Sequence, residues 1–194
     1  MQHTLFPSIV HQLEVDNFQK DNLIKFVEDQ KLNDPQGLQR TNKGGWHSHL
    51  NYHQYDNPIS CTIVQSLIKY FSNTEVFKDR FEFKIVSMWI NVNEEGDYNS
   101  MHLHPNSHFS AVFWIKAPEN SGRLEFTSPH GFTQNLEILR YSDKFRNNNN
   151  IHTSFYFEPI EGNILLFPAS LYHEVSPSKS KENRISVAFN LNLC

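Results

Sequence analysis

RISVAFNL, residues 184–191, has side chains of two kinds in alternation. Side chains two residues apart on a β-strand point to the same side of the sheet. One side of this stretch is therefore apolar, with Ile185, Val187, Phe189 and Leu191. The other side carries Arg184, Ser186 and Asn190, which require polar surroundings. The stretch predicts a strand that lies between a hydrophobic layer and a polar site.

Short strands of this kind fill the sequence from residue 81 onward. Phe81, Phe83 and Ile85 alternate with charged residues, and further runs cover residues 108–115, 124–126, 154–157 and 164–167. Turn residues separate the runs, for example Glu95-Gly96-Asp97 and Glu161-Gly162-Asn163. The pattern predicts many short strands in a β-sandwich or jelly roll.

The first part of the chain indicates two helices. One starts near Asp21, which we expect as its N-cap, and the other at Asn57-Pro58, a cap followed by a first-turn proline. The second helix has an apolar face, which we expect to be buried: Ile63, Val64, Leu67, Ile68 and Phe71. Residues 44–54, GGWHSHLNYHQ, are expected to form an ordered loop or short edge strand. The whole predicts a mainly β fold with N-terminal helices (α+β).

Length and composition limit the classes of protein that the chain can represent. Its 194 residues form one expected domain, 1–194, with a helical support region at 1–80 and a strand core at 81–194. A chain of this length folds without a structural metal, so a metal site would serve function. Cys61 and Cys194 lie far apart, which excludes a disulfide scaffold. The 17 Lys and Arg residues form no cluster, which argues against nucleic-acid binding. No run approaches a membrane span, and MQHTLFPSIV resembles no signal peptide, so a cytoplasmic location is expected.

The 11 histidines are unevenly placed. His102 and His104 are two residues apart, so on a strand both imidazoles face the same side and can chelate one metal. His173 follows far downstream, with Arg184 eleven positions after it. A second cluster, His47, His49 and His53, has no such distant partners, and we interpret it as a substrate-side or structural element.

These residues resemble the signature of the Fe(II)- and 2-oxoglutarate-dependent oxygenases, in particular the group found in bacteria and phages. That signature is His-x-Asp/Glu, a distant His, and an Arg about ten residues later. The resemblance covers about half of the chain, from Trp89 to Asn192, and rests on Trp89-Ile-Asn91, Gly96, His102-Leu-His104-Pro105, Ser110, Gly162, Phe167-Pro168, His173 and Arg184-Ile-Ser186. It implies a double-stranded β-helix, a jelly roll of the cupin type, backed here by the helices.

The resemblance also implies roles for single residues. His102 and His173 become iron ligands, and Arg184 pairs with the distal carboxylate of 2-oxoglutarate, assisted by the Ser186 hydroxyl. A guanidinium offers a planar fork that matches a carboxylate. Asn91 and Ser110 are expected as further polar contacts to the co-substrate. The implied cofactors are Fe(II), 2-oxoglutarate as co-substrate, and O2.

One position departs from the family pattern. His104 stands where the usual two-histidine, one-carboxylate site has Asp or Glu. A three-histidine site of His102, His104 and His173 is chemically reasonable because neutral imidazoles suit Fe(II). Two alternatives stay open: Asp97 or Glu125 supplies the missing carboxylate, or the site binds another metal.

The sequence thus predicts a non-haem Fe(II)/2-oxoglutarate-dependent dioxygenase, a hydroxylase of a protein side chain or a small metabolite. A second hypothesis is a cupin-like three-histidine dioxygenase that uses no 2-oxoglutarate, with Arg184 binding the substrate's own carboxylate. A third is a non-catalytic jelly-roll module with a structural or sensory metal. The expected partner is a small-molecule or peptidyl substrate, with neither nucleic acid nor membrane.

Overall fold

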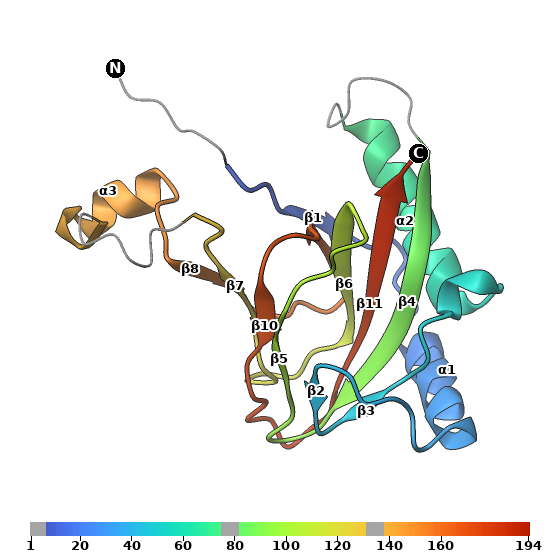
Figure 1. The fold of residues 1–194 in the computed structure, drawn as a ribbon. Coiled ribbons are helices and arrows are strands. Elements are labelled where there is room, and N and C mark those ends of the chain that lie inside the picture. The colour runs from blue at the N-terminus through green and yellow to red at the C-terminus, as the bar shows by residue number, and fades with distance from the viewer. Residues whose placement is uncertain (1–6, 75–81, 131–137) are drawn as a thin grey trace.

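Two antiparallel sheets face each other in the computed structural model, which describes residues 7–74, 82–130 and 138–194 (Figure 1). The six-stranded sheet has the order β1 (His11–Glu14), β9 (Asn163–Pro168), β6 (Phe109–Lys116), β11 (Arg184–Leu193), β4 (Phe83–Asn93) and β3 (Trp46–His47). The five-stranded sheet has the order β2 (Asn42–Lys43), β5 (Tyr98–His102), β10 (His173–Val175), β7 (Leu124–Thr127) and β8 (Ser154–Phe157). The predicted mainly β fold is confirmed.

The second half of the chain crosses repeatedly from one sheet to the other. Strands β4, β6, β9 and β11 belong to the larger sheet, whereas β5, β7, β8 and β10 belong to the smaller one. Apart from β7 and β8, which pair with each other, strands that are neighbours in sequence from β4 to β11 therefore lie in opposite sheets, which is the arrangement of a jelly roll. A cavity between the sheets is lined by residues from both.

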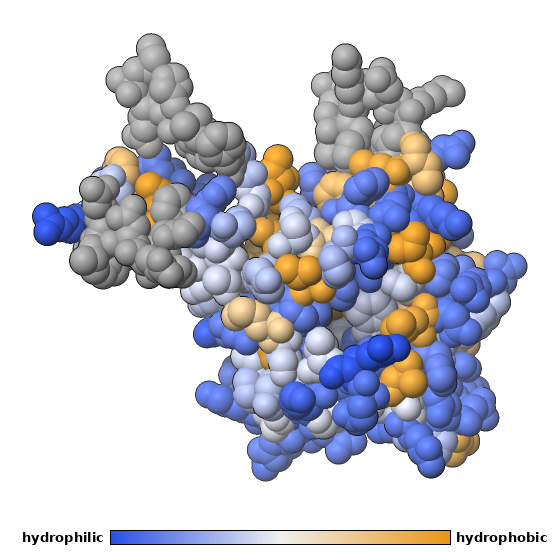
Figure 2. Space-filling view, in the orientation of Figure 1, coloured by the Kyte–Doolittle hydropathy of each residue, from blue (hydrophilic) through white to orange (hydrophobic). Residues whose placement is uncertain are grey.

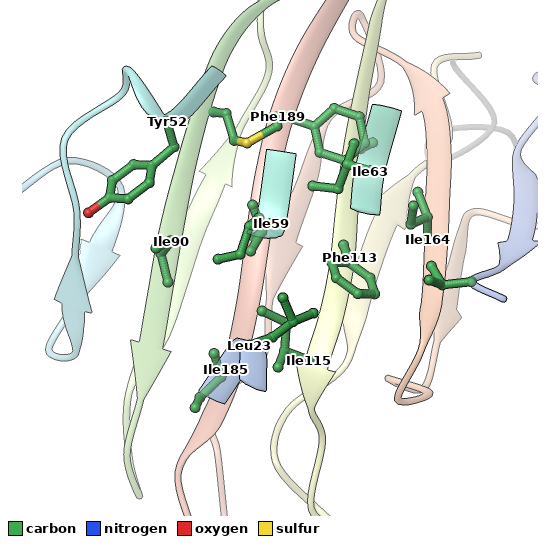
Figure 3. Close-up of a cluster of buried hydrophobic side chains, with 14 of the residues drawn as sticks. Leu23, Tyr52, Ile59, Ile63, Ile90, Phe113, Ile115, Ile164, Ile185 and Phe189 are labelled. Carbon is green, nitrogen blue, oxygen red and sulfur yellow. The ribbon is translucent and has the colours of Figure 1, made fainter. Parts of the chain in front are cut away.

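Two helices, α1 (Lys20–Asn33) and α2 (Pro58–Asn73), cover the outer face of the larger sheet (Figure 1). Figure 3 shows Leu23 of α1 and Ile59 and Ile63 of α2 among strand residues such as Phe113 and Phe189. These side chains are at most 1% exposed. Burying an apolar side chain of this size contributes about 1.5–3 kcal/mol, so this layer fixes the position of the larger sheet.

The strand at residues 184–191 lies in the middle of this arrangement, as β11 between β4 and β6. Its apolar side chains, Ile185, Val187, Phe189 and Leu191, are at most 2% exposed and pack in the cluster shared with the helices. Arg184, Ser186 and Asn190 line the cavity between the sheets. The predicted division of this strand into an apolar and a polar face is confirmed.

The start of α2 was predicted correctly, whereas the start of α1 was not. The Asn57 side chain accepts the Ile59 and Ser60 backbone N–H groups, and the Ser60 hydroxyl accepts the Asn57 N–H, which is a capping box. The N-cap of α1 is Gln19 rather than Asp21. Asp21 lies in the first turn, where its charge stabilises the helix dipole instead.

Two further expectations need correction or restriction. Ile68 of α2 is 52% exposed, because it lies outside the hydrophobic cluster that Ile63 and Leu67 join. Phe81 lies outside the described residues. In the 44–54 segment, the structure contains the edge strand β3 and a turn of 3-10 helix, η1 (Tyr52–Gln54).

The remaining elements are short, and the surface is mixed. A 3-10 turn, η3 (Ile138–Arg140), and helix α3 (Asp143–Asn148) lie in the connection from β7 to β8. Hydrophilic residues cover much of the face in Figure 2, interrupted by smaller apolar areas. Within the described ranges, no helix has the length and apolar character needed to cross a membrane.

Candidate metal centre

Three histidines converge on the inner side of the smaller sheet. His102 at the end of β5 lies directly opposite His173 at the start of β10. His104 follows β5 by two residues, and its backbone N–H donates to the Ala169 carbonyl (2.9 Å). One ring nitrogen from each histidine lies within 4.8 Å of those of the other two. One divalent metal ion could therefore contact all three side chains.

Backbone carbonyls fix the tautomers of two of these rings. Nδ1 of His102 lies 2.7 Å from the Ser100 carbonyl oxygen, and Nδ1 of His173 lies 2.8 Å from that of Leu171. A carbonyl oxygen only accepts, so both Nδ1 atoms carry the proton. Each Nε2 then has a free lone pair, which is the state of a metal-ligating imidazole.

Burial keeps the three imidazoles neutral. It lowers the pKa of His173 to about 3, with the charges of His102 and His104 acting in the same direction. It lowers the pKa of His104 to about 4, again with a contribution from His102. The pKa of His102 is also lowered by burial, against the hydrogen bond to Ser100. At neutral pH the cluster offers three uncharged nitrogen donors, which suit divalent iron, nickel or zinc.

Neither alternative carboxylate joins this group of histidines. Glu125 of β7 pairs with Glu174, one residue beyond the His173–Phe126 pair, so its side chain points to the opposite face of the sheet. Its carboxylate accepts from Nε of Arg123 (2.6 Å). Asp97, in the turn between β4 and β5, accepts the Glu94 backbone N–H (2.7 Å). Among the described residues, the metal-ligating group that contains the histidines has no acidic member.

Arg184 lies in the same cavity, on the larger sheet. Its side chain is 2% exposed, with Nη1 donating to the carbonyls of Ser121 (2.7 Å) and Gly122 (3.1 Å) and Nη2 to Oδ1 of Asn93 (2.9 Å). Its Nε is buried without a hydrogen-bond partner. Gly122 has φ +86°, and a Cβ there would lie 2.3 Å from the Ser176 carbonyl oxygen and 3.0 Å from Nη1 of Arg184. Glycine therefore allows these backbone carbonyls to reach the guanidinium.

The charge of Arg184 is not balanced by an ion pair. Burial lowers its pKa to about 10, with Asp97 acting in the opposite direction, so the guanidinium remains charged at neutral pH. None of the described carboxylates lies within ion-pair distance of it. A buried charge is costly without a counter-ion. The cavity is therefore suited to an anion at this position.

The other predicted contact residues line the same cavity. Asn91 on β4, Ser110 on β6 and Ser186 on β11 are all buried and face it. Asn91 Oδ1 has no hydrogen-bond partner, and the Ser110 hydroxyl donates to Oδ1 of Asn190 (2.7 Å). The structure thus gathers the three histidines and the four predicted co-substrate residues around one cavity, which the alternative ligands Asp97 and Glu125 do not line.

A family model now identifies the chain. The model described as "Putative 2OG-Fe(II) oxygenase" matches residues 87–190. The chain belongs to the 2OG-Fe(II) oxygenase family. The matched region starts on β4 and ends on β11, so it contains strands of both sheets and all three histidines, whereas β1, β2 and β3 lie before it.

Solved structures place this oxygenase in the double-stranded β-helix fold. A prolyl-4-hydroxylase from Pseudomonas putida is 14% identical, with a TM-score of 0.58 over 94% of this chain and 92% of that one. HygX from Streptomyces hygroscopicus, with nickel, 2-oxoglutarate and hygromycin B bound, is 9% identical, with a TM-score of 0.63 over 95% and 82%. A 2OG-Fe(II) oxygenase family protein from Burkholderia pseudomallei is 20% identical, with a TM-score of 0.50 over 71% of this chain. The chain covers 60% of that protein's length. No curated protein matches the oxygenase.

The residues of the cavity fit the cofactors of this family. Three neutral imidazoles, two with Nε2 freed by backbone hydrogen bonds, are suitable donors for Fe(II). The unbalanced Arg184 guanidinium, with its unpartnered Nε, is a suitable partner for a carboxylate of 2-oxoglutarate. The three imidazoles thus fit a metal ion, and Arg184 on the opposite sheet fits a carboxylate of a dicarboxylate.

Sequence reasoning missed three contributors to the cavity of the oxygenase. Asn93 holds Arg184, and its position two residues after Asn91 on the same strand was an available signal. Trp89 lines the cavity, and His47 stacks on it with ring centroids 5.7 Å apart and planes at 9°. Thr41 lines the cavity from the loop before β2, and nothing in the sequence around it indicates this. His47 is therefore a buried residue of the larger sheet that packs against Trp89.

Proposed function

We propose that this oxygenase binds Fe(II) through His102, His104 and His173 and 2-oxoglutarate through Arg184. One observation carries the proposal: a cluster of neutral imidazoles and an unpaired buried guanidinium share one cavity, on opposite sheets. A dicarboxylate that reaches a metal with one end can place its other carboxylate on a cation deeper in the cavity. The arrangement of donor set and cation supports this assignment.

Three polar side chains complete the proposed co-substrate site. Ser186 lies two residues from Arg184 on β11 and can donate its hydroxyl to the same carboxylate. Asn91, its neighbour on β4, lines the cavity and has a buried Oδ1 without a hydrogen-bond partner. Ser110 on β6 is already bonded to Asn190, which leaves its hydroxyl oxygen as an acceptor. These groups bind and orient the co-substrate in our proposal.

The proposed reaction is the oxidation of a C–H bond in a second substrate. Bound iron would supply the oxygen chemistry, driven by oxidative decarboxylation of 2-oxoglutarate to succinate and CO2. The protein would hold three coordination positions, leave the others open, and bind the co-substrate through residues such as Arg184 and Ser186, which are at most 5% exposed. We propose that the substrate is a peptidyl side chain or a small metabolite. We also propose that the oxygenase itself is cytoplasmic. One structural neighbour is a prolyl-4-hydroxylase, and another, HygX, has the small molecule hygromycin B bound.

The third imidazole changes the charge of the proposed site. A carboxylate at position 104 would add one negative charge beside the metal, whereas His104 adds none. Three imidazoles and Fe(II), together with dianionic 2-oxoglutarate, make a centre without net charge. This donor set is also the one that the dioxygenases without 2-oxoglutarate would use, so the assay must distinguish the two reactions.

Anaerobic titration tests the proposal. Addition of Fe(II) and then 2-oxoglutarate to the purified protein should produce the weak visible charge-transfer band of a chelated keto acid. Admission of O2 should then release succinate. His173→Ala should lose most of the metal and the band, whereas His49→Ala, which removes a mostly exposed histidine outside the cavity, should retain both.

The outcomes separate the three hypotheses. Metal binding without the band would favour a three-histidine enzyme that does not use 2-oxoglutarate. Metal binding without any O2-dependent turnover would favour a non-catalytic module. Equal metal content in His173→Ala and the unchanged protein would overturn the site itself.

A further inference from the structure

Asn190 connects the larger sheet to the third histidine. It lies on β11, is 7% exposed and lines the cavity. Its Oδ1 accepts from the Ser110 hydroxyl (2.7 Å), and its Nδ2 donates to the Ser87 hydroxyl (2.9 Å). The same Nδ2 lies 3.4 Å from Nδ1 of His104. Both ends of the carboxamide are therefore held by hydroxyl groups, with the imidazole beside one end.

His104 differs from the other two histidines in what faces its Nδ1. His102 and His173 each donate from Nδ1 to a carbonyl two residues earlier, at Ser100 and Leu171. Nδ1 of His104 instead lies beside the side chain of Asn190. A ligating imidazole needs an acceptor at its other nitrogen to fix ring and tautomer. Asn190 occupies the place that a backbone carbonyl takes for the other two.

The carboxamide can serve either tautomer of His104. With Nδ2 toward the ring, Nδ1 accepts and Nε2 carries the proton, so Nε2 cannot bind a metal. A half turn of the carboxamide brings Oδ1 to the ring, where it accepts from Nδ1–H and frees the Nε2 lone pair. Serine hydroxyls both donate and accept, so Ser87 and Ser110 can bond the carboxamide in both orientations.

We infer that Asn190 is a positioning residue for metal binding, which accepts the Nδ1 proton of His104 through Oδ1 when the metal is bound. The inference rests on the proposed function, because it takes His104 as a ligand through Nε2. A carboxylate ligand at this position would need no tautomer control. Asn190, bonded to Ser87 and Ser110, therefore supplies from the opposite sheet the Nδ1 acceptor that His104 needs as a ligand.

Two substitutions of Asn190 separate positioning from mere packing. Asn190→Leu keeps the branched shape of the side chain and removes the acceptor, so the affinity for Zn(II), used as a redox-inert probe, should fall about 10- to 100-fold. Asn190→Asp supplies an oxygen acceptor in the same place and should restore the affinity. Asn192→Leu makes the same change on the same strand, where the side chain instead accepts the His108 N–H, and should leave the affinity unchanged.

Nitrogen-15 spectra of the imidazoles provide a readout independent of activity. In the Zn(II)-loaded protein and in Asn190→Asp, His104 should be protonated at Nδ1. In Asn190→Leu that proton should exchange rapidly with water. Unchanged Zn(II) affinity in Asn190→Leu, or an equal loss in Asn190→Asp, would overturn the inference. If instead His173→Ala bound Zn(II) as tightly as the unchanged protein, the proposed metal site would fail first.

Discussion

At the scale of single residues, Arg184 is the group whose role is most directly testable. Arg184→Ala removes the buried cation, and a carboxylate left without its partner loses a few kcal/mol of binding energy. We therefore expect 2-oxoglutarate to bind roughly 100-fold more weakly by calorimetry, with metal content unchanged. Arg184→Lys keeps the charge and loses the planar fork, so its affinity should lie in between.

A matched control for Arg184 is Lys181→Ala. Lys181 lies three residues before Arg184, in the connection from β10 to β11, but its side chain is exposed and its ion pair with Glu95 lies on the surface. Its loss should leave co-substrate affinity unchanged. Equal affinity of Arg184→Ala and the unchanged protein would remove the main support for 2-oxoglutarate binding in this cavity.

His104 supports a second prediction at this scale. His104→Asp should restore the usual family triad, retain iron, and keep or raise uncoupled 2-oxoglutarate decarboxylation. His104→Leu should lose metal affinity because it leaves two strong protein donors. Metal analysis and succinate release, measured on both variants, provide the test. Tolerance of leucine, with iron lost on replacing Asp97 or Glu125, would show that a carboxylate is the third ligand.

The sequence could define the candidates for the third ligand but not choose among them. His102 and His104 face one side because they are two residues apart, which is a local property. Glu125 lies next to Phe126, and which of the two faces the cavity depends on how β7 pairs with β10. That pairing joins segments about fifty residues apart, so no local pattern reveals it. The same holds for Thr41, which a distant loop brings to the cavity.

At the scale of elements, Glu161 joins α1 to the ends of two strands. Its carboxylate accepts from Lys20 of α1 (2.5 Å) and from the Ala117 backbone N–H just after β6 (2.9 Å), and it precedes β9. Burial alone raises its pKa, but the hydrogen bonds from Lys20 and Ala117, with the charges of Lys20 and Lys116, lower it overall. The ionised form therefore stabilises the contact between helix and sheet.

This lowered pKa predicts a pH-dependent contribution to stability. A carboxyl group with a lower pKa in the folded state stabilises the protein above its unfolded pKa of about 4.3, and loses this effect as pH falls through the folded pKa. Glu161→Gln should lower the free energy of unfolding by about 0.5–1 kcal/mol at neutral pH, because both partners are partly exposed. The difference from the unchanged protein should decrease in denaturation curves as the pH falls below about 4.3, and vanish once the pH lies below the folded pKa. Glu14→Gln, at an exposed position on β1, should show no such difference.

Helices and strands were predictable from the sequence where neighbouring residues alone mark a helix start or divide a strand into a polar and an apolar face. The cap and first-turn proline at Asn57-Pro58 and the alternation of β11 depend on neighbouring residues, and both are found where expected. The start of α1 was misplaced because Gln19 makes no side-chain cap hydrogen bond. Without such a bond, the first helical residue depends on contacts with the sheet, such as that of Lys20 with Glu161.

At the scale of the whole molecule, the candidate site is divided between the two sheets. His102 and His173 belong to strands β5 and β10 of the smaller sheet, and His104 follows β5. The co-substrate residues Arg184 and Ser186 belong to β11, the strand held on its other face by α1 and α2. A ligand that contacts both groups would couple the small sheet to the helix-backed large one.

Because the site is divided between the sheets, we expect the metal to raise Tm by itself and 2-oxoglutarate to add most of its stabilisation only after the metal has bound. A ligand at one hundred times its dissociation constant adds about 2.7 kcal/mol, which is about 5–10 °C in Tm for a chain of this length. Ni(II), a substitute that does not turn over, should raise Tm alone, since its three ligands lie on one side of the cavity. 2-Oxoglutarate should raise Tm substantially more when Ni(II) is present, because it then contacts both sheets.

Arg184→Ala should keep the Ni(II) shift and lose the further shift, whereas His173→Ala should lose both. An equal 2-oxoglutarate shift with and without Ni(II) would mean that the acid binds Arg184 independently of the metal, and that the two sheets are not coupled through it.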